Sequence, residues 1–163
     1  MNRVILDTNI YGLIVVDSNT ATIRQGIKSA DVIIYGNSVI RKELRNTPKG
    51  IIDGINLRMD LLRIYQDVTK KELSIEKREN DLAEMYSKAY IELGGSVSPK
   101  KLKNDFLIVA SASTHNLDIV VSEDNSTMLN ELALRGYRVI NSALKLKVPR
   151  FIGYEEFKNL IKR

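Results

Sequence analysis

The chain contains no cysteine and no apolar run approaching the length of a membrane span. The lack of cysteine excludes disulfides and thiolate metal sites. A bilayer span needs roughly 20 consecutive apolar residues, and none is present. Asp7 and Asn9 interrupt the first apolar stretch, which argues against a signal peptide. We therefore expect a soluble, cytoplasmic protein with no membrane contact.

Several catalytic signatures are also missing. There is no glycine-rich phosphate loop and no dinucleotide-binding fingerprint. The single histidine, His115, stands near the predicted end of a helix, where a favourable contact with the helix dipole accounts for it. A serine–histidine catalytic triad is therefore a poor hypothesis for this chain.

The composition favours one folded domain with a basic surface. The 163 residues are 44% apolar and 28% charged, which predicts a single domain over residues 1–163 with a substantial core. The net charge is +5, which favours a polyanionic partner. The basic residues are widely scattered, so a soluble protein with lysine-rich solvated faces fits the charge equally well.

Hydrophobic patterning predicts an α/β fold. Short apolar runs predict strands over residues 3–6, 31–35, 118–121 and 136–140. Amphipathic or capped segments predict helices over residues 8–29 with a break near 17–20, then over 37–46, from Pro48 onward, and over 75–93, 99–115, 126–134 and 154–162. Strands alternating with helices indicate a parallel sheet flanked by helices. Residues 47–98 look purely helical, which predicts a helical insertion or cap on that sheet.

Acidic residues follow two of the predicted strands. The apolar run Val4–Leu6 stops at Asp7, and the run before Ser122 leads to Glu123 and Asp124. In open α/β sheets, ligands bind at the carboxyl ends of the strands. The alternative is structural, because aspartate commonly caps a following helix or closes a turn, and either aspartate could do so.

Two further acids lie on the apolar sides of predicted helices. Glu43 shares its side with Ile40 and Leu44, and Asp105 shares its side with Leu102 and Ile108. A carboxylate on a core-facing side is expected to be protonated, paired or bound to metal. An ion pair with arginine or lysine from the sheet edge is the structural alternative.

Four such acids in one small domain suggest a divalent-cation site. Mg²⁺ and Mn²⁺ prefer oxygen ligands, and a bound ion lowers the pKa of water and shields the charge of a phosphodiester. We expect Asp7, Asp105 and Asp124 to be the most direct ligands, with Glu43 acting through water or on a second ion. Polar neighbours suited to orient acids or waters are Thr8, Asn9 and Ser122.

In these residues the chain resembles the PIN-domain nucleases. The resemblance covers nearly the whole chain, and the matching pieces are Leu6-Asp7-Thr8-Asn9, Glu43 in its helix, Asn104-Asp105-Phe-Leu-Ile-Val-Ala-Ser-Ala, and Val-Val-Ser122-Glu123-Asp124. The resemblance implies a Rossmann-like PIN fold and metal-dependent cleavage of single-stranded or structured RNA. It assigns the acidic tetrad to Asp7, Glu43, Asp105 and Asp124. The companions would be Thr8 or Asn9 near the first acid and Ser122 near the last.

The resemblance also implies partners. Many small members are toxins of VapBC-type toxin–antitoxin pairs, which are typically dimers inhibited by a partner that reaches into the acidic groove. A homodimer and an antitoxin protein are therefore expected. The long segment between Glu43 and Asp105 departs from that compact type, so a housekeeping RNA-processing nuclease is the competing role. Glu123 beside Asp124 leaves open which acid faces the metal.

The leading hypothesis is an endoribonuclease, with an RNA substrate held by Lys100, Lys101 and Lys103 beside Asp105. A non-catalytic RNA-binding module on the same fold would keep the basic surface without needing all four acids. A phosphotransfer receiver-like domain also clusters acids at a sheet edge. That design fits poorly, because two of the four acids here lie on predicted helices.

Overall fold

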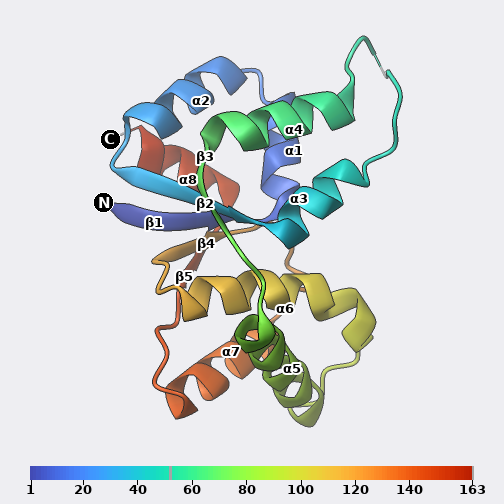
Figure 1. The fold of residues 1–163 in the computed structure, drawn as a ribbon, viewed down its shortest axis with the longest axis vertical. Helices are drawn as coiled ribbons and strands as arrows, with labels where there is room; N and C mark the ends of the chain where they lie inside the picture. The colour runs from blue at the N-terminus through green and yellow to red at the C-terminus, as the bar shows by residue number, and fades with distance from the viewer. Residues whose placement is uncertain (52, 163) are drawn as a thin grey trace.

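The computed structural model describes residues 1–51 and 53–162. Within them, five parallel strands form one sheet in the order β3-β2-β1-β4-β5 (Figure 1). The strands are β1 (Asn2–Leu6), β2 (Val32–Asn37), β3 (Thr69–Leu73), β4 (Ile119–Val121) and β5 (Arg150–Ile152). The helices are α1 (Thr8–Val16), α2 (Thr20–Ser29), α3 (Ser38–Arg45), α4 (Leu57–Val68), α5 (Lys77–Glu92), α6 (Pro99–Thr114), α7 (Glu131–Ala143) and α8 (Tyr154–Ile161).

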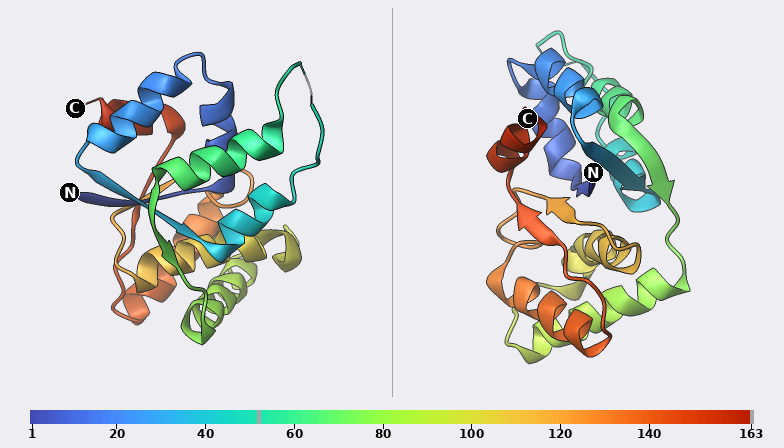
Figure 2. Two further views of the ribbon diagram at one scale, coloured as in Figure 1. Left: turned by 45° about the horizontal axis from the view of Figure 1, so that its top comes forward. Right: turned by 90° about the vertical axis from the view of Figure 1, so that its left-hand side faces the viewer.

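Helices cover both faces of the sheet. One layer contains α1, α2, α4 and α8, and the other contains α5, α6 and α7 (Figures 1 and 2). Helix α3 follows β2 directly and contacts both α4 and α6. Val4, Ile5 and Leu6 of β1 are completely buried, as expected for a strand covered on both faces. None of the helices in the described ranges is long and apolar enough to cross a membrane.

The register of β1 and β4 brings two polar segments together. Leu6 of β1 pairs with Val121 of β4, so Asp7 and Ser122 each lie one residue beyond paired positions. The Asp7 amide donates to the Val121 carbonyl at 2.9 Å, which extends the ladder past the end of β1. The carboxyl ends of these neighbouring strands therefore meet at one edge of the sheet.

The prediction that residues 47–98 are purely helical is wrong at β3. The sequence Thr-Lys-Lys-Glu-Leu is an edge strand that pairs in parallel with β2. It has no apolar run because its middle residues face solvent, and only its backbone is needed for pairing. The helix expected from Pro48 begins instead at Leu57, where the Asn56 side chain caps it; residue 52 lies outside the described residues.

The strand predicted over residues 136–140 is also wrong. These residues lie inside α7, whose buried residues Ala133, Gly136, Tyr137 and Asn141 recur at helical spacing. The helix expected over residues 126–134 begins only at Glu131, after turns. The fifth strand is β5, a three-residue strand that the sequence analysis did not predict.

Candidate functional site

Asp7 is buried at the carboxyl end of β1, with only 4% of its surface exposed. Its Oδ1 accepts a hydrogen bond from the Thr8 amide at 2.7 Å, and its Oδ2 accepts one from the Ser122 hydroxyl at 2.7 Å. Burial raises the pKa of Asp7 to about 6, and repulsion from Glu43 and Asp124 adds to the rise. Asp7 is thus the N-cap of α1, as the structural alternative proposed, and also a member of an acidic group.

Ser122 joins the ends of β1 and β4. Its hydroxyl is fully buried, donates to Asp7 and accepts a hydrogen bond from the Asp124 amide at 3.0 Å. One side chain therefore fixes the position of the first acid and of the backbone that carries the last. This is the orienting geometry expected of a residue beside a ligand site.

Asp124 closes the turn that follows β4. Its Oδ1 accepts hydrogen bonds from the Thr127 amide at 3.0 Å and from the Ser126 hydroxyl at 2.9 Å. Burial alone would raise the pKa of Asp124, but these hydrogen bonds outweigh it and hold the pKa below its usual value. Asp124 therefore remains ionised near neutrality, and the turn role that the sequence allowed is realised.

The neighbouring Glu123 faces a different part of the molecule. Its Oε1 accepts a hydrogen bond from the Tyr154 amide at the start of α8. A side chain at Gly153 would collide with that carboxylate, because a Cβ there would lie 2.7 Å from it. Of the two adjacent acids, Asp124 is the one whose charge acts on Asp7.

Asp105 and Glu43 complete the acidic group from α6 and α3, and both side chains are half-buried. Burial, together with weaker repulsion from Asp7, Asp124 and Glu43, raises the pKa of Asp105 to about 7. The Thr127 hydroxyl lies close enough to lower the pKa of Asp105 but does not reach hydrogen-bond geometry. The four acids named from the sequence therefore share one electrostatic neighbourhood.

In the described part of the chain, no cationic side chain pairs with the acidic group. Among the ion pairs of residues 1–51 and 53–162, none involves these four acids. The ion-pair alternative for Glu43 and Asp105 is thus not found in the described part of the chain. The hydroxyls of Thr8 and Thr127 are buried beside the acids and lack hydrogen-bond partners. Unbalanced carboxylates with unused hydroxyls form an oxygen donor set of the kind that suits Mg²⁺ or Mn²⁺.

The carboxylates of the acidic group do not surround a single metal position in the described residues. Within the part of the chain that the structure describes, no three histidine or acidic side chains are close enough together to hold one ion. Metal binding would require these carboxylates to turn inward, with waters or phosphate oxygens completing the coordination.

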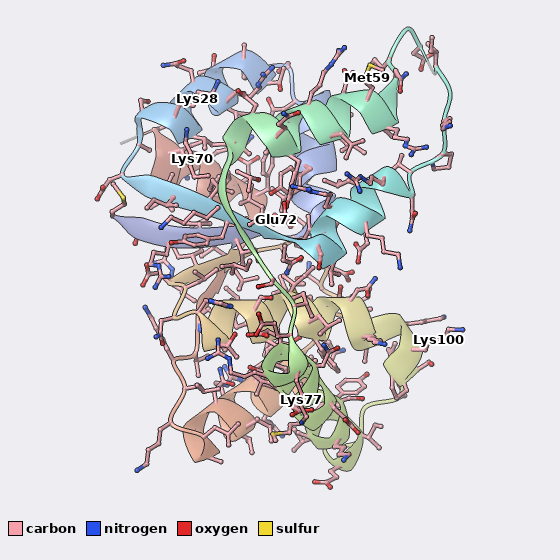
Figure 3. The ribbon with its side chains drawn as sticks, in the orientation of Figure 1. Lys28, Met59, Lys70, Glu72, Lys77 and Lys100 are labelled. Carbon is pink, nitrogen blue, oxygen red and sulfur yellow. The ribbon has the colours of Figure 1, made fainter. Side chains whose placement is uncertain are left out.

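Other residues named from the sequence lie outside the acidic group, and Lys100 and Lys103 line a pocket against α5 with Phe106 and Leu107. Asn9 is exposed in the first turn of α1. Lys100, Lys101 and Lys103 are exposed at the start of α6, where Figure 3 labels Lys100. They surround the end of the helix that carries Asp105, and nothing in the described residues pairs with them.

Two supporting residues were not recognised from the sequence. Asn37 is fully buried; its Oδ1 caps α3 through the Ile40 amide, and its Nδ2 donates to the Ser111 hydroxyl at 3.3 Å. This contact sets the helix that carries Glu43 against the helix that carries Asp105. Its capping role was readable from the sequence, but the contact with Ser111 depends on the fold. Thr127 was missed as well, although its spacing from Asp124 fits a capped turn.

Comparisons with known proteins identify the fold. No protein-family model and no curated protein match the chain. A chain in the structure of VapBC2 from Rickettsia felis bound to a promoter DNA fragment is 14% identical, with a TM-score of 0.57 over 93% of this chain and 98% of that one. The structure of FitAB bound to the IR36 DNA fragment gives 13% identity and a TM-score of 0.58, over 93% and 94% of the two chains. A chain of DNA-bound VapBC from Salmonella typhimurium is 14% identical, with a TM-score of 0.56 over 94% of this chain and 99% of that one.

These likenesses cover almost the whole chain at low sequence identity, so they show the fold alone. The predicted fold class, an α/β protein with a parallel sheet flanked by helices, is confirmed, and the fold is similar to that of chains in the VapBC2 and FitAB structures.

Proposed function

We propose that this protein is a metal-dependent endoribonuclease that hydrolyses RNA phosphodiester bonds. The observation that carries the proposal is that four acids, none of them paired with a cation among the described residues, repel one another at one end of a parallel sheet. The raised pKa values of Asp7 and Asp105 support it, because buried, mutually repelling carboxylates are relieved most directly by a cation. The acids around one or two Mg²⁺ or Mn²⁺ ions would be Asp7, Glu43, Asp105 and Asp124.

The chain's own residues would hold and orient the reacting groups. When bound, the metal supplies an activated water and shields the negative charge of the scissile phosphate. Ser122 holds the Asp7 carboxylate in place, and the Ser126 and Thr127 contacts hold Asp124 ionised. Lys100, Lys101 and Lys103 would bind RNA phosphates beside the site.

The biological role that fits best is the toxin of a toxin–antitoxin pair. The support is the fold shared with chains of the VapBC and FitAB complexes. In that role the protein forms a homodimer and is inhibited by a small antitoxin protein. Light scattering at micromolar concentration tests the dimer, and a monomeric mass would contradict it. A housekeeping RNA-processing nuclease is the alternative role for the same chemistry.

A second candidate function is a non-catalytic RNA-binding module. The observation that favours it is the separation of the acids, no three of which in the described residues are placed to hold one ion. The module would bind RNA through its basic residues and leave the RNA intact, with or without metal.

The decisive experiment compares three purified proteins on a mixed RNA pool with Mn²⁺. Wild type should cleave and lose its activity in chelator. Asp7→Asn should fold but not cleave, because it loses a metal-binding charge at nearly constant volume. Asp118→Asn is the matched control, since that carboxylate pairs with Lys147 away from the acidic group. Equal cleavage by wild type and Asp7→Asn would refute the assigned site. Binding of RNA without cleavage by any of the proteins would support the module.

A further inference from the structure

A basic cleft lies between α3, α4 and β3. Its volume is about 540 Å³, and four cationic side chains line it, Arg41 and Arg45 from α3 and Lys70 and Lys71 from β3. Glu72 is the one acid in its lining. Figure 3 shows Lys70 and Glu72 on the edge strand. The cleft is separate from the acidic group, because none of the four acids lines it.

Most of the charge in this cleft is unneutralised. Arg41 pairs with Glu72, and its guanidinium lies 5.6 Å from the centre of the Tyr65 ring. Arg45, Lys70 and Lys71 form no ion pair with any residue that the structure describes. By contrast, the neighbouring cations Arg24 and Lys28 both pair with Asp67.

Neutral polar side chains also line the cleft. The Tyr65 hydroxyl donates to Glu72 at 3.1 Å and lies against Gly36, where a Cβ would come within 2.1 Å of it. The Thr69 hydroxyl is buried and has no hydrogen-bond partner among the described residues. Gln66 adds an amide to the lining. The Gln66 amide beside several cations without ion pairs is suited to phosphate oxygens.

Helix α3 connects the cleft to the acidic group. Successive helical residues are about 100° apart, so Glu43 lies on the side of α3 opposite Arg41 and Arg45. An α-helix with its side chains is about 10–12 Å across, which a polynucleotide backbone can cross easily. A strand whose scissile phosphate lay at the acids could therefore place other phosphates in the cleft.

We infer that this cleft binds the phosphate backbone of single-stranded RNA, as a substrate-holding site of the proposed nuclease; in this respect it rests on the proposed function. A repeating polyanion matches cations spread over a helix and a strand. An added peptide strand fits less well, because lysines on an edge strand oppose pairing with another chain.

The test measures RNA binding without requiring cleavage. A labelled single-stranded RNA oligonucleotide is titrated with protein in chelator, and its fluorescence anisotropy is followed at several salt concentrations. Lys70→Gln/Lys71→Gln should weaken binding about tenfold and reduce the slope of log K against log salt by about 1–1.5, as expected for two lost single-strand contacts. The matched control is Arg135→Gln/Arg138→Gln, which removes two exposed charges from α7.

A variant in the opposite direction sharpens the result. Glu72→Gln removes the acid of the cleft and releases Arg41, so RNA binding should tighten several-fold. Circular dichroism checks that each variant is folded. The inference is overturned if the Lys70/Lys71 variant binds RNA as wild type does, if the control loses as much affinity, or if wild type binds no RNA.

The inference and the proposed function can fail separately. If the Lys70/Lys71 variant binds RNA more weakly and wild type does not cleave RNA, the RNA-binding role of the cleft is supported and the nuclease activity is refuted. If wild type cleaves RNA and this variant binds RNA as tightly as wild type does, the nuclease activity is supported and the RNA-binding role of the cleft is refuted.

Discussion

The acids at the two ends of the central sheet differ in whether a cation pairs with them. At the amino end, Asp31 precedes β2 and pairs with the terminal ammonium group at 2.8 Å. Asp118 precedes β4, accepts from the Arg3 amide at 2.7 Å and pairs with Lys147. At the carboxyl end, Asp7 and Asp124 follow β1 and β4 with no cation paired to them in the described residues.

For Asp118 and Asp7, this difference reverses the effect of ionisation on the stability of the fold. The Lys147 ammonium holds the pKa of Asp118 below its usual value, so ionisation of that carboxyl stabilises the fold. Burial raises the pKa of Asp7 to about 6, so ionisation of this carboxyl destabilises the fold. An uncompensated charge retained at a ligand-binding edge is a physical reason to place function there.

The largest effect is expected on cleavage, from Asp105→Asn. Losing a direct metal ligand should reduce the cleavage rate on the order of 1,000-fold, since loss of an outer-shell group alone costs about 10–100-fold. The matched change at the amino end, Asp31→Asn, should leave cleavage unchanged. Initial rates on one RNA substrate with Mn²⁺ measure both. Equal rates for the two variants would remove the distinction between the ends of the sheet.

The next effect is a pH dependence of stability without metal. The folded state holds the Asp7 proton more tightly than the unfolded state, whose carboxyl has a pKa near 3.8. The resulting stabilisation is complete below about pH 4 and is lost as the pH rises through about 6. Relative to Asp7→Asn, wild type should therefore lose about 2–3 kcal/mol between pH 4 and 7.5.

Urea unfolding of both proteins in chelator at several pH values measures this loss. Mn²⁺ at pH 7.5 should restore stability to wild type more than to Asp7→Asn. If the difference in unfolding free energy between the two proteins does not vary with pH, ionisation of Asp7 does not destabilise the fold.

The smallest effect concerns the amino end alone. Asp118→Asn removes a half-exposed ion pair and weakens a hydrogen bond to the Arg3 amide, which should cost about 1–2 kcal/mol at pH 7. This cost should shrink as the pH falls, because the lowered pKa of Asp118 stabilises the fold only while the carboxyl is ionised. If Asp118→Asn has the same free energy of unfolding as wild type at pH 7, the ion pair with Lys147 does not stabilise the fold.

The sequence predicted those parts of the fold whose patterns are local. Val4–Leu6 is an uninterrupted apolar run, and Leu102, Ile108 and Ala112 recur at helical spacing in the sequence of α6, which buries every residue from Phe106 to Ser113. β3 escaped notice because a polar edge strand has no apolar pattern. The strand predicted over residues 136–140 was wrong because Tyr, Val and Ile favour strands, whereas packing of Gly136 and Tyr137 in α7 decides the structure.

The candidate site was predictable in its acids but not in their surroundings. Asp7 and Asp124 stand out because a carboxylate ends each apolar run. That Glu123 turns toward Tyr154 could not be read from the sequence, because it depends on where α8 begins in space. The basic cleft was missed for the same reason: Arg41 and Lys70 come together only when β3 pairs with β2.

The hydrogen bond from Ser122 to Asp7 also constrains when the site can assemble. It joins residues 115 positions apart in the chain, and such distant contacts form late because the loop between them must first be closed. On the ribosome, Asp7 emerges well before β4, so β1 cannot pair with β4 until residues 119–121 have been synthesised. A partly synthesised chain therefore carries the first acid without its partners, and the acidic group forms only as the parallel sheet is completed.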